Sequence, residues 1–223
     1  MSATPAPPPR QGPVATRAPE LIPFAEPVGQ TAARKDDHLR IAATTRALHA
    51  GGNGLDRHRL IHRAMPGRDL DQVDLATSLL GRPLDAPVVI SAMTGGTPAA
   101  GVINARLAEA AARHGVALAL GSGRALLRDP RLLSTYVGPA RPPLLIANIG
   151  APQLLEADGL DEAERLVDLL DADAIAVQLN PLQEAIQPEG QTSFSGLVER
   201  IAALCGRLEG MPVVVKEVGF GIH

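Results

Sequence analysis

The sequence has 223 residues, of which 45% are hydrophobic, and a formal net charge of −3. This length and apolar content predict one domain with a single core, and the interspersed charges argue against a nucleic-acid or membrane-surface partner. No apolar run approaches the roughly 20 residues of a membrane-spanning helix, and no signal-peptide pattern opens the chain, so a cytoplasmic location is expected. The single cysteine, Cys205, fits a reducing compartment and is expected to pack within a helix.

The first part of the chain shows little periodicity. Residues 1–30 are rich in proline and alanine and are expected to form a disordered tail. Residues 31–223 are expected to form the folded domain, beginning with a helix over 32–48. Residues 51–87 are expected to be irregular, apart from a short element over 74–80.

From residue 88 onward, short apolar runs alternate with longer amphipathic ones. The short runs predict five strands, at 88–93, 116–120, 143–149, 174–179 and 212–218. Helices are expected over 99–114, after Thr97 as the N-cap and Pro98, and over 161–170 and 197–208. Strands that alternate with helices in this way indicate parallel βα units.

A polar residue follows the carboxyl end of each expected strand. These residues are Thr94, Ser122, Asn148, Gln178 with Asn180, and Lys216. Alternation along 174–180 puts two alanines, Gln178 and Asn180 on one face, which would be the inner face of a barrel. Barrels and doubly wound sheets both bind ligands at this end of their strands, so the pattern predicts a site without choosing between the two folds.

Five ordered segments together resemble one family, the FMN-dependent, type 2 isopentenyl-diphosphate isomerases. They are residues 34–38 (RKDDH), 91–96 (SAMTGG), 147–151 (ANIGA), 179–190 (LNPLQEAIQPEG) and 215–221 (VKEVGFG). The resemblance covers about residues 33–222 and implies an α/β fold, a TIM (β/α)8 barrel of which about five of the eight βα units are present.

The resemblance implies an FMN site. It assigns cofactor contacts to Ala92, Met93, Thr94, Ser122, Asn148 and Lys216. Glycines after Thr94 would let the backbone approach a planar ring, although an ordinary strand-to-helix turn also needs glycine. Asn148 could instead cap a turn. Lys216 on the inner face needs an anionic partner, which is either reduced flavin or a carboxylate such as Glu217.

The resemblance also implies a diphosphate substrate. It assigns substrate contacts to Arg34, Lys35, His38, Arg124, Gln178, Asn180 and Gln183, places Gln183 near the reacting alkene and makes Glu184 a Mg2+ ligand. Arg and Lys suit phosphate oxygens, and a carboxylate suits a hard cation. The alternative for residues 34–38 and for Glu184 is a solvated, charged helix start.

The implied reaction converts isopentenyl diphosphate into dimethylallyl diphosphate, with reduced FMN, Mg2+, and NAD(P)H as reductant. The only partners expected are this small-molecule substrate and further copies of the complete chain in a homo-oligomer. One alternative is an FMN-dependent oxidoreductase of the 2-hydroxy-acid type. The other is an inactive fragment or an interaction remnant.

The sequence departs from the family pattern at three points. Gln178 stands where the family usually has histidine, and Gly123 where it usually has glutamine. The third is the end of the sequence at His223, after five expected strands, which predicts a C-terminally truncated barrel. We expect such a chain to be neither stable nor active alone, because its two outer strands would each lack a neighbour.

Overall fold

The structure is a computed structural model that describes residues 30–44, 57–187, 190–219 and 221–222, with side chains from Lys35 onward. The expected tail therefore lies almost wholly outside the described residues. The first expected helix is observed as α1 (Gln30–Ala42), and residues 45–48 of that prediction also lie outside the described part.

Five parallel strands form the central sheet. They are β3 (Val89–Ile90), β4 (Ala117–Ala119), β5 (Leu145–Gly150), β6 (Ala174–Leu179) and β7 (Val213–Glu217). Their order in the sheet is β3-β4-β5-β6-β7, the same as their order in the chain. A doubly wound sheet reverses direction at a switch point, whereas a barrel adds each strand beside the previous one. The sequential order therefore confirms the predicted part of a TIM barrel.

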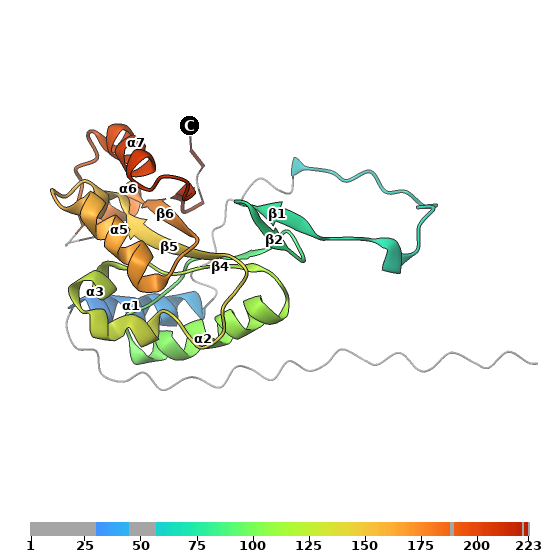
Figure 1. The fold of residues 1–223 in the computed structure, drawn as a ribbon, viewed down its shortest axis with the longest axis horizontal. Helices are drawn as coiled ribbons and strands as arrows, with labels where there is room; N and C mark the ends of the chain where they lie inside the picture. Colours follow the sequence, from blue (N-terminus) through green and yellow to red (C-terminus); the bar gives the residue numbers. More distant parts are fainter. Residues whose placement is uncertain (1–29, 45–56, 188–189, 220, 223) are drawn as a thin grey trace, which may run out of the picture.

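The helices follow the strands, and all of them except α6 contribute side chains to the core on one side of the sheet (Figure 1). They are α2 (Pro98–Arg113), α3 (Arg124–Arg128), the 3-10 helix η4 (Pro130–Thr135), α4 (Ala151–Leu154), α5 (Gly159–Leu170), α6 (Pro181–Ile186) and α7 (Leu197–Arg207). The Thr97 side chain accepts a hydrogen bond from the amide of Ala100, so it is the predicted N-cap of α2. Within the described residues, no helix has both the length and the apolar content needed to cross a membrane.

The outer face of the sheet carries the larger core. Its buried side chains include Leu118, Ile149, Ile175 and Val177 from the strands, and Leu126, Leu154, Leu166 and Leu204 from the helices. Branched side chains at alternate strand positions pack here, as the alternation predicts. The prediction for Cys205 is wrong: Leu204 fills the core from α7, and the next residue points into solvent.

The inner face is lined by smaller residues. Ala117, Ala119, Ile146, Ala174 and Ala176 form a second cluster, against which Val214 packs. Small side chains leave room on this concave side of the sheet. The predicted inward position of the two alanines of β6 is therefore confirmed.

An antiparallel hairpin, β1 (Thr77–Leu79) and β2 (Arg82–Leu84), covers the inner face at the amino ends of the strands. Its first strand lies within the short element expected over 74–80, whereas its second strand corrects the irregular structure expected for the residues that follow. Leu80 and Gly81 have φ of 51° and 78°, so both turn residues are left-handed. Arg82 donates a hydrogen bond of 2.6 Å to Asp173, the residue before β6, which ties the hairpin to the sheet. The 3-10 helix η3 (Leu70–Gln72) precedes the hairpin.

Candidate functional site

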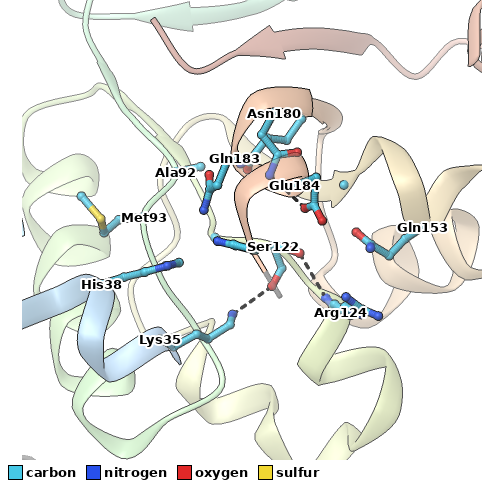
Figure 2. Close-up of a pocket in the computed structure, with 14 residues that line it drawn as sticks. Lys35, His38, Ala92, Met93, Ser122, Arg124, Gln153, Asn180, Gln183 and Glu184 are labelled. Atoms are coloured by element: carbon cyan, nitrogen blue, oxygen red, sulfur yellow. Dashed lines mark hydrogen bonds between the residues drawn. The ribbon is translucent and has the colours of Figure 1, made fainter. Parts of the chain in front are cut away.

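A cavity of about 120 Å³ opens at the carboxyl ends of β3 to β6. Its lining includes ten of the predicted residues: Lys35, His38, Ala92, Met93, Ser122, Arg124, Gln178, Asn180, Gln183 and Glu184. Figure 2 shows cationic side chains from α1 and α3 on one side and the residues of α6 on the other. Ligand pockets usually measure about 300–1,000 Å³, so this cavity alone is smaller than a typical cofactor site.

The cationic side is held by backbone contacts. Lys35 Nζ donates a hydrogen bond of 3.2 Å to the Ser122 carbonyl, which joins α1 to the loop after β4. The Arg124 amide lies 3.5 Å from the Ser122 hydroxyl at the start of α3. His38, one helical turn after Lys35, also lines the cavity. Arg34 lies in α1, but its side chain is outside the described residues.

The opposite side is built around the Glu184 carboxylate. Its Oε1 accepts a hydrogen bond of 3.0 Å from the Asn180 side-chain amide, and its Oε2 accepts one of 2.9 Å from the Gln191 backbone amide. Each carboxylate oxygen therefore keeps a lone pair after these bonds. Asn180 Oδ1 is buried without a hydrogen-bond partner. These are hard oxygen donors of the kind that Mg2+ binds, so the residues fit such an ion.

Thr94 and Asn148 are not among the residues that line the cavity. Asn148 is fully buried, and both polar atoms of its side chain lack a hydrogen-bond partner. Thr94 Oγ1 is also buried and unpartnered. Gly121, which lines the cavity, approaches the Thr94 backbone so closely that a Cβ there would lie 2.5 Å from the Thr94 carbonyl oxygen. Buried polar atoms normally have partners, so these fit the polar edge of a flavin.

Lys216 lies on β7, paired in register with Gln178. Strand alternation puts it on the same face as Val214, which packs in the inner cluster, but it does not line the cavity. Burial lowers the pKa of its ammonium group, and the nearby Glu217 opposes that shift. The Glu217 carboxylate itself accepts hydrogen bonds from the amides of Gly219 and Gly221. The ammonium is thus partly desolvated, which suits an anionic ligand on the inner face.

Sequence reasoning missed a polar network behind Glu184. Gln153 lines the cavity and donates a hydrogen bond of 2.8 Å to the Gln191 side chain, which in turn donates one of 3.0 Å to Glu156. At Gly190 a Cβ would collide with the Glu184 carbonyl oxygen. One signal was available, because Gln153 follows the end of β5 just as the predicted polar residues follow other strands.

Comparisons with known proteins show which proteins the chain is similar to. The family of FMN-dependent dehydrogenases, whose fold is a TIM barrel, matches residues 37–126. An isopentenyl-diphosphate delta-isomerase of Nostoc sp. is 44% identical over 196 residues, which is 86% of this chain and 56% of that protein. Proteins of the same name from Xanthobacter autotrophicus and Synechocystis sp. are 49% and 48% identical over 85% of this chain. The chain spans about 55–56% of the length of these relatives.

Proposed function

We propose that this chain, a homologue of the isopentenyl-diphosphate delta-isomerases, forms the cofactor- and substrate-binding wall of an enzyme that converts isopentenyl diphosphate into dimethylallyl diphosphate. The observation that carries the proposal is the charge arrangement of the cavity. Cationic side chains on one side face a carboxylate and amide oxygens on the other, at the end of the strands where barrels hold their active sites.

The cationic side binds the diphosphate of the substrate. Arg124 offers a planar fork that matches two phosphate oxygens, whereas Lys35 offers a compact point charge. His38 adds a ring N–H donor, and Arg34 contributes from the preceding residue of α1. The support is that Lys35, His38 and Arg124 line one cavity although they come from distant parts of the chain.

Glu184 would hold a magnesium ion, which would screen the negative charge of the diphosphate. The support is that both of its oxygens are oriented by hydrogen bonds and that Asn180 Oδ1 lies unpartnered in the same group. Gln178 and Asn180 contact the substrate from the end of β6. Gln178 cannot become cationic as a histidine could, so its contact with phosphate is a neutral hydrogen bond.

FMN would be held by the Ala92 and Met93 backbone, Ser122, and the unpartnered groups of Thr94 and Asn148, and Lys216 would offset its negative charge. Reduced FMN, when bound, supplies the acid–base group, and NAD(P)H is the proposed reductant. One proton is added to the terminal alkene carbon and one is removed from the methylene next to the internal alkene carbon, so the double bond moves and no net redox change occurs. Gln183 positions the alkene, because an amide is too weak an acid to donate that proton.

The test uses the protein expressed from its complete natural reading frame. Isopentenyl diphosphate would be followed by proton NMR with FMN, a reductant and Mg2+, and with each omitted in turn. Turnover is expected only when all three are present. Equal turnover in air without flavin would overturn the proposal.

Variants at the two sides of the cavity should separate binding from catalysis. Arg124→Ala should raise KM about ten-fold with little change in kcat, because contacts to the unreacting diphosphate bind substrate and transition state equally. Arg34→Ala should behave in the same way. Arg128→Ala is the matched control, since Arg128 is exposed at the other end of α3. A fall in kcat without a rise in KM would place Arg124 elsewhere in the mechanism.

Glu184→Gln should lower the rate and weaken the dependence on Mg2+ together. Glu199→Gln, an exposed acid on α7, is the control for loss of one negative charge. An unchanged Mg2+ requirement and kcat in Glu184→Gln would remove the metal assignment.

A second candidate function is net oxidation of a substrate by FMN. The match of residues 37–126 to the FMN-dependent dehydrogenases favours it. Steady reduction of added flavin by a 2-hydroxy acid would support this candidate over the isomerase. The cytoplasmic location and the homo-oligomer stay predictions, which cell fractionation and light scattering would test.

A further inference from the structure

Tyr136 follows η4 and is the largest fully buried side chain of the described residues, with 1% of its surface exposed. Its hydroxyl lies 2.9 Å from the Ser122 carbonyl and 3.2 Å from Lys35 Nζ. Lys35 Nζ and the Ser122 carbonyl are themselves 3.2 Å apart. The three atoms form a closed triangle that joins α1, the loop after β4 and the segment after η4.

The direction of each bond in this triangle follows from its chemistry. An ammonium group can only donate, and a carbonyl can only accept. The Tyr136 hydroxyl must therefore accept from Lys35 and donate to Ser122. Burial raises the pKa of Tyr136, so the hydroxyl stays protonated and keeps this arrangement at neutral pH.

The tyrosine ring is fixed by the glycine turn after β3. A Cβ at Gly95 would collide with the ring, and one at Gly96 would lie 3.4 Å from the hydroxyl oxygen. Lys35 Nζ also lies 5.3 Å from the ring centroid, within the range of a cation–π contact. The hydroxyl is therefore a rigid acceptor, whereas a lysine stem is flexible and loses side-chain entropy when it is ordered.

We propose that Tyr136 is a positioning residue, whose hydroxyl directs the Lys35 ammonium into the cavity and thereby sets its affinity for phosphate groups. The inference rests on the proposed function only in that Lys35 binds the diphosphate. Tyr136 touches neither substrate nor cofactor in this assignment and acts through the lysine. The competing interpretation is that the ring fills the core and the hydroxyl merely has its bonds satisfied.

The first experiment measures binding of inorganic pyrophosphate by calorimetry, without flavin, to the protein expressed from its complete natural reading frame. Tyr136→Phe keeps the ring and should weaken binding about five-fold, the usual effect of one hydrogen bond. Lys35→Met should weaken it at least as much. Ser134→Ala, which removes an exposed hydroxyl from the same segment, is the matched control and should leave binding unchanged.

The double variant Lys35→Met/Tyr136→Phe separates positioning from packing. If Tyr136 acts through Lys35, the double variant should bind no more weakly than Lys35→Met alone. Additive losses, or wild-type affinity in Tyr136→Phe while Lys35→Met is impaired, would overturn the inference and leave the proposed function standing. Wild-type affinity in Lys35→Met would instead remove the assignment of Lys35 in the proposed function.

A second measurement follows the Tyr136 ring itself. Growth with 3-fluorotyrosine labels the tyrosines, and the fluorine NMR signal that is lost in Tyr136→Phe is assigned to Tyr136. Saturation with pyrophosphate should shift its fluorine NMR signal in the wild-type protein and leave it unmoved in Lys35→Met. An unmoved signal in the wild-type protein under saturation would also overturn the inference.

Discussion

The two faces of the central sheet differ in the size of their buried side chains and in whether their buried polar groups are hydrogen-bonded. On the outer face, Ile175 and Val177 are fully buried among leucines of α5 and α7. On the inner face, alanines occupy the equivalent positions, and Asn148 is fully buried with neither polar side-chain atom hydrogen-bonded. The outer face therefore supplies packing free energy, whereas the inner face leaves buried polar groups whose hydration has been lost without replacement.

Because of this difference, alternate residues of the same strand either pack in the outer core or present polar groups on the inner face. Ala147 and Ile149 of β5 pack against the helices, while Asn148 between them points to the concave side. A buried, unpartnered amide lowers stability unless a ligand completes its hydrogen bonds. Substitutions on the outer face should therefore mainly lower the stability of the fold. Substitutions on the inner face should mainly lower the affinity for a ligand.

The largest effect is expected on the outer face. Ile175→Ala should lower the free energy of unfolding by about 3 kcal/mol, because it leaves a cavity in a fully packed core. Val198→Ala is the control, since Val198 on α7 is 77% exposed and its truncation should cost little. Urea denaturation measures both. Equal losses of unfolding free energy in the two variants would show that Ile175 is not part of a tightly packed core.

The inner face should respond with the opposite sign. Asn148→Leu is expected to raise the stability of the flavin-free protein by about 1 kcal/mol, because it removes unpartnered buried atoms. The same change should weaken FMN binding about ten-fold, measured by flavin fluorescence.

Asn104 provides the matched control for Asn148. It is also buried, but its side-chain amide donates to the carbonyls of Thr94 and Thr135 at 3.1 and 2.8 Å. Asn104→Leu should therefore lower stability by about 1–3 kcal/mol, since two carbonyls lose their donor. If Asn148→Leu destabilises the flavin-free protein as Asn104→Leu does, the assignment of Asn148 to a ligand is wrong.

Lys216, on the inner face, should make the stability of the protein depend on pH. Because burial lowers its pKa, the unfolded state binds the proton more tightly than the folded state. Stability should therefore rise with pH between the lowered pKa and the ordinary pKa of lysine, and Lys216→Met should remove this part of the rise.

The pKa of Lys216 can be measured directly after selective carbon-13 labelling of the lysine side chains. The signal that disappears in Lys216→Met is assigned to Lys216. Added FMN should raise the pKa of Lys216, since an anion favours the charged form. If added FMN leaves the pKa of Lys216 unchanged, Lys216 does not contact the cofactor.

The smallest effect, on metal-ion affinity, is expected from a change at Gln191, which contacts Glu184. Gln191→Ala keeps the backbone amide that binds the carboxylate but removes the side-chain bridge from Gln153 to Glu156. Mn2+ affinity, measured by electron paramagnetic resonance, should fall about two- to three-fold, as for outer hydrogen bonds of modest strength. Thr192→Ala, at the exposed next residue, should leave it unchanged.

Much of this fold could be predicted because the spacing of hydrophobic residues along the sequence reflects which side chains are buried. Residues 174–179 were predicted as a strand with the bounds that β6 has, and the second expected helix agrees with α2 to within one residue at each end. The first strand is shorter than expected, with ladder pairs only at Val89 and Ile90. The hairpin was missed because Leu80-Gly81 is an unusual left-handed turn and Pro83 argues against a strand.

The site was predictable only where side chains act directly. The resemblance and the strand-end pattern pointed to Lys35, Ser122 and Glu184, which the structure brings to one cavity. Tyr136 and Gln191 contact the cavity residues Lys35 and Glu184 from behind, and these contacts involve residues distant in the sequence or backbone groups. Spacing along a sequence carries no information on such contacts, so only the folded arrangement shows them.

The bond between Arg82 and Asp173 joins residues 91 positions apart and has a consequence for biosynthesis. At about 5–20 residues per second, a ribosome adds Asp173 roughly 5–20 s after Arg82. Throughout that interval Leu84 lacks the start of β6, against which it packs. The hairpin that covers the inner face is therefore translated early, but the packing of Leu84 cannot be completed until β6 has been synthesised.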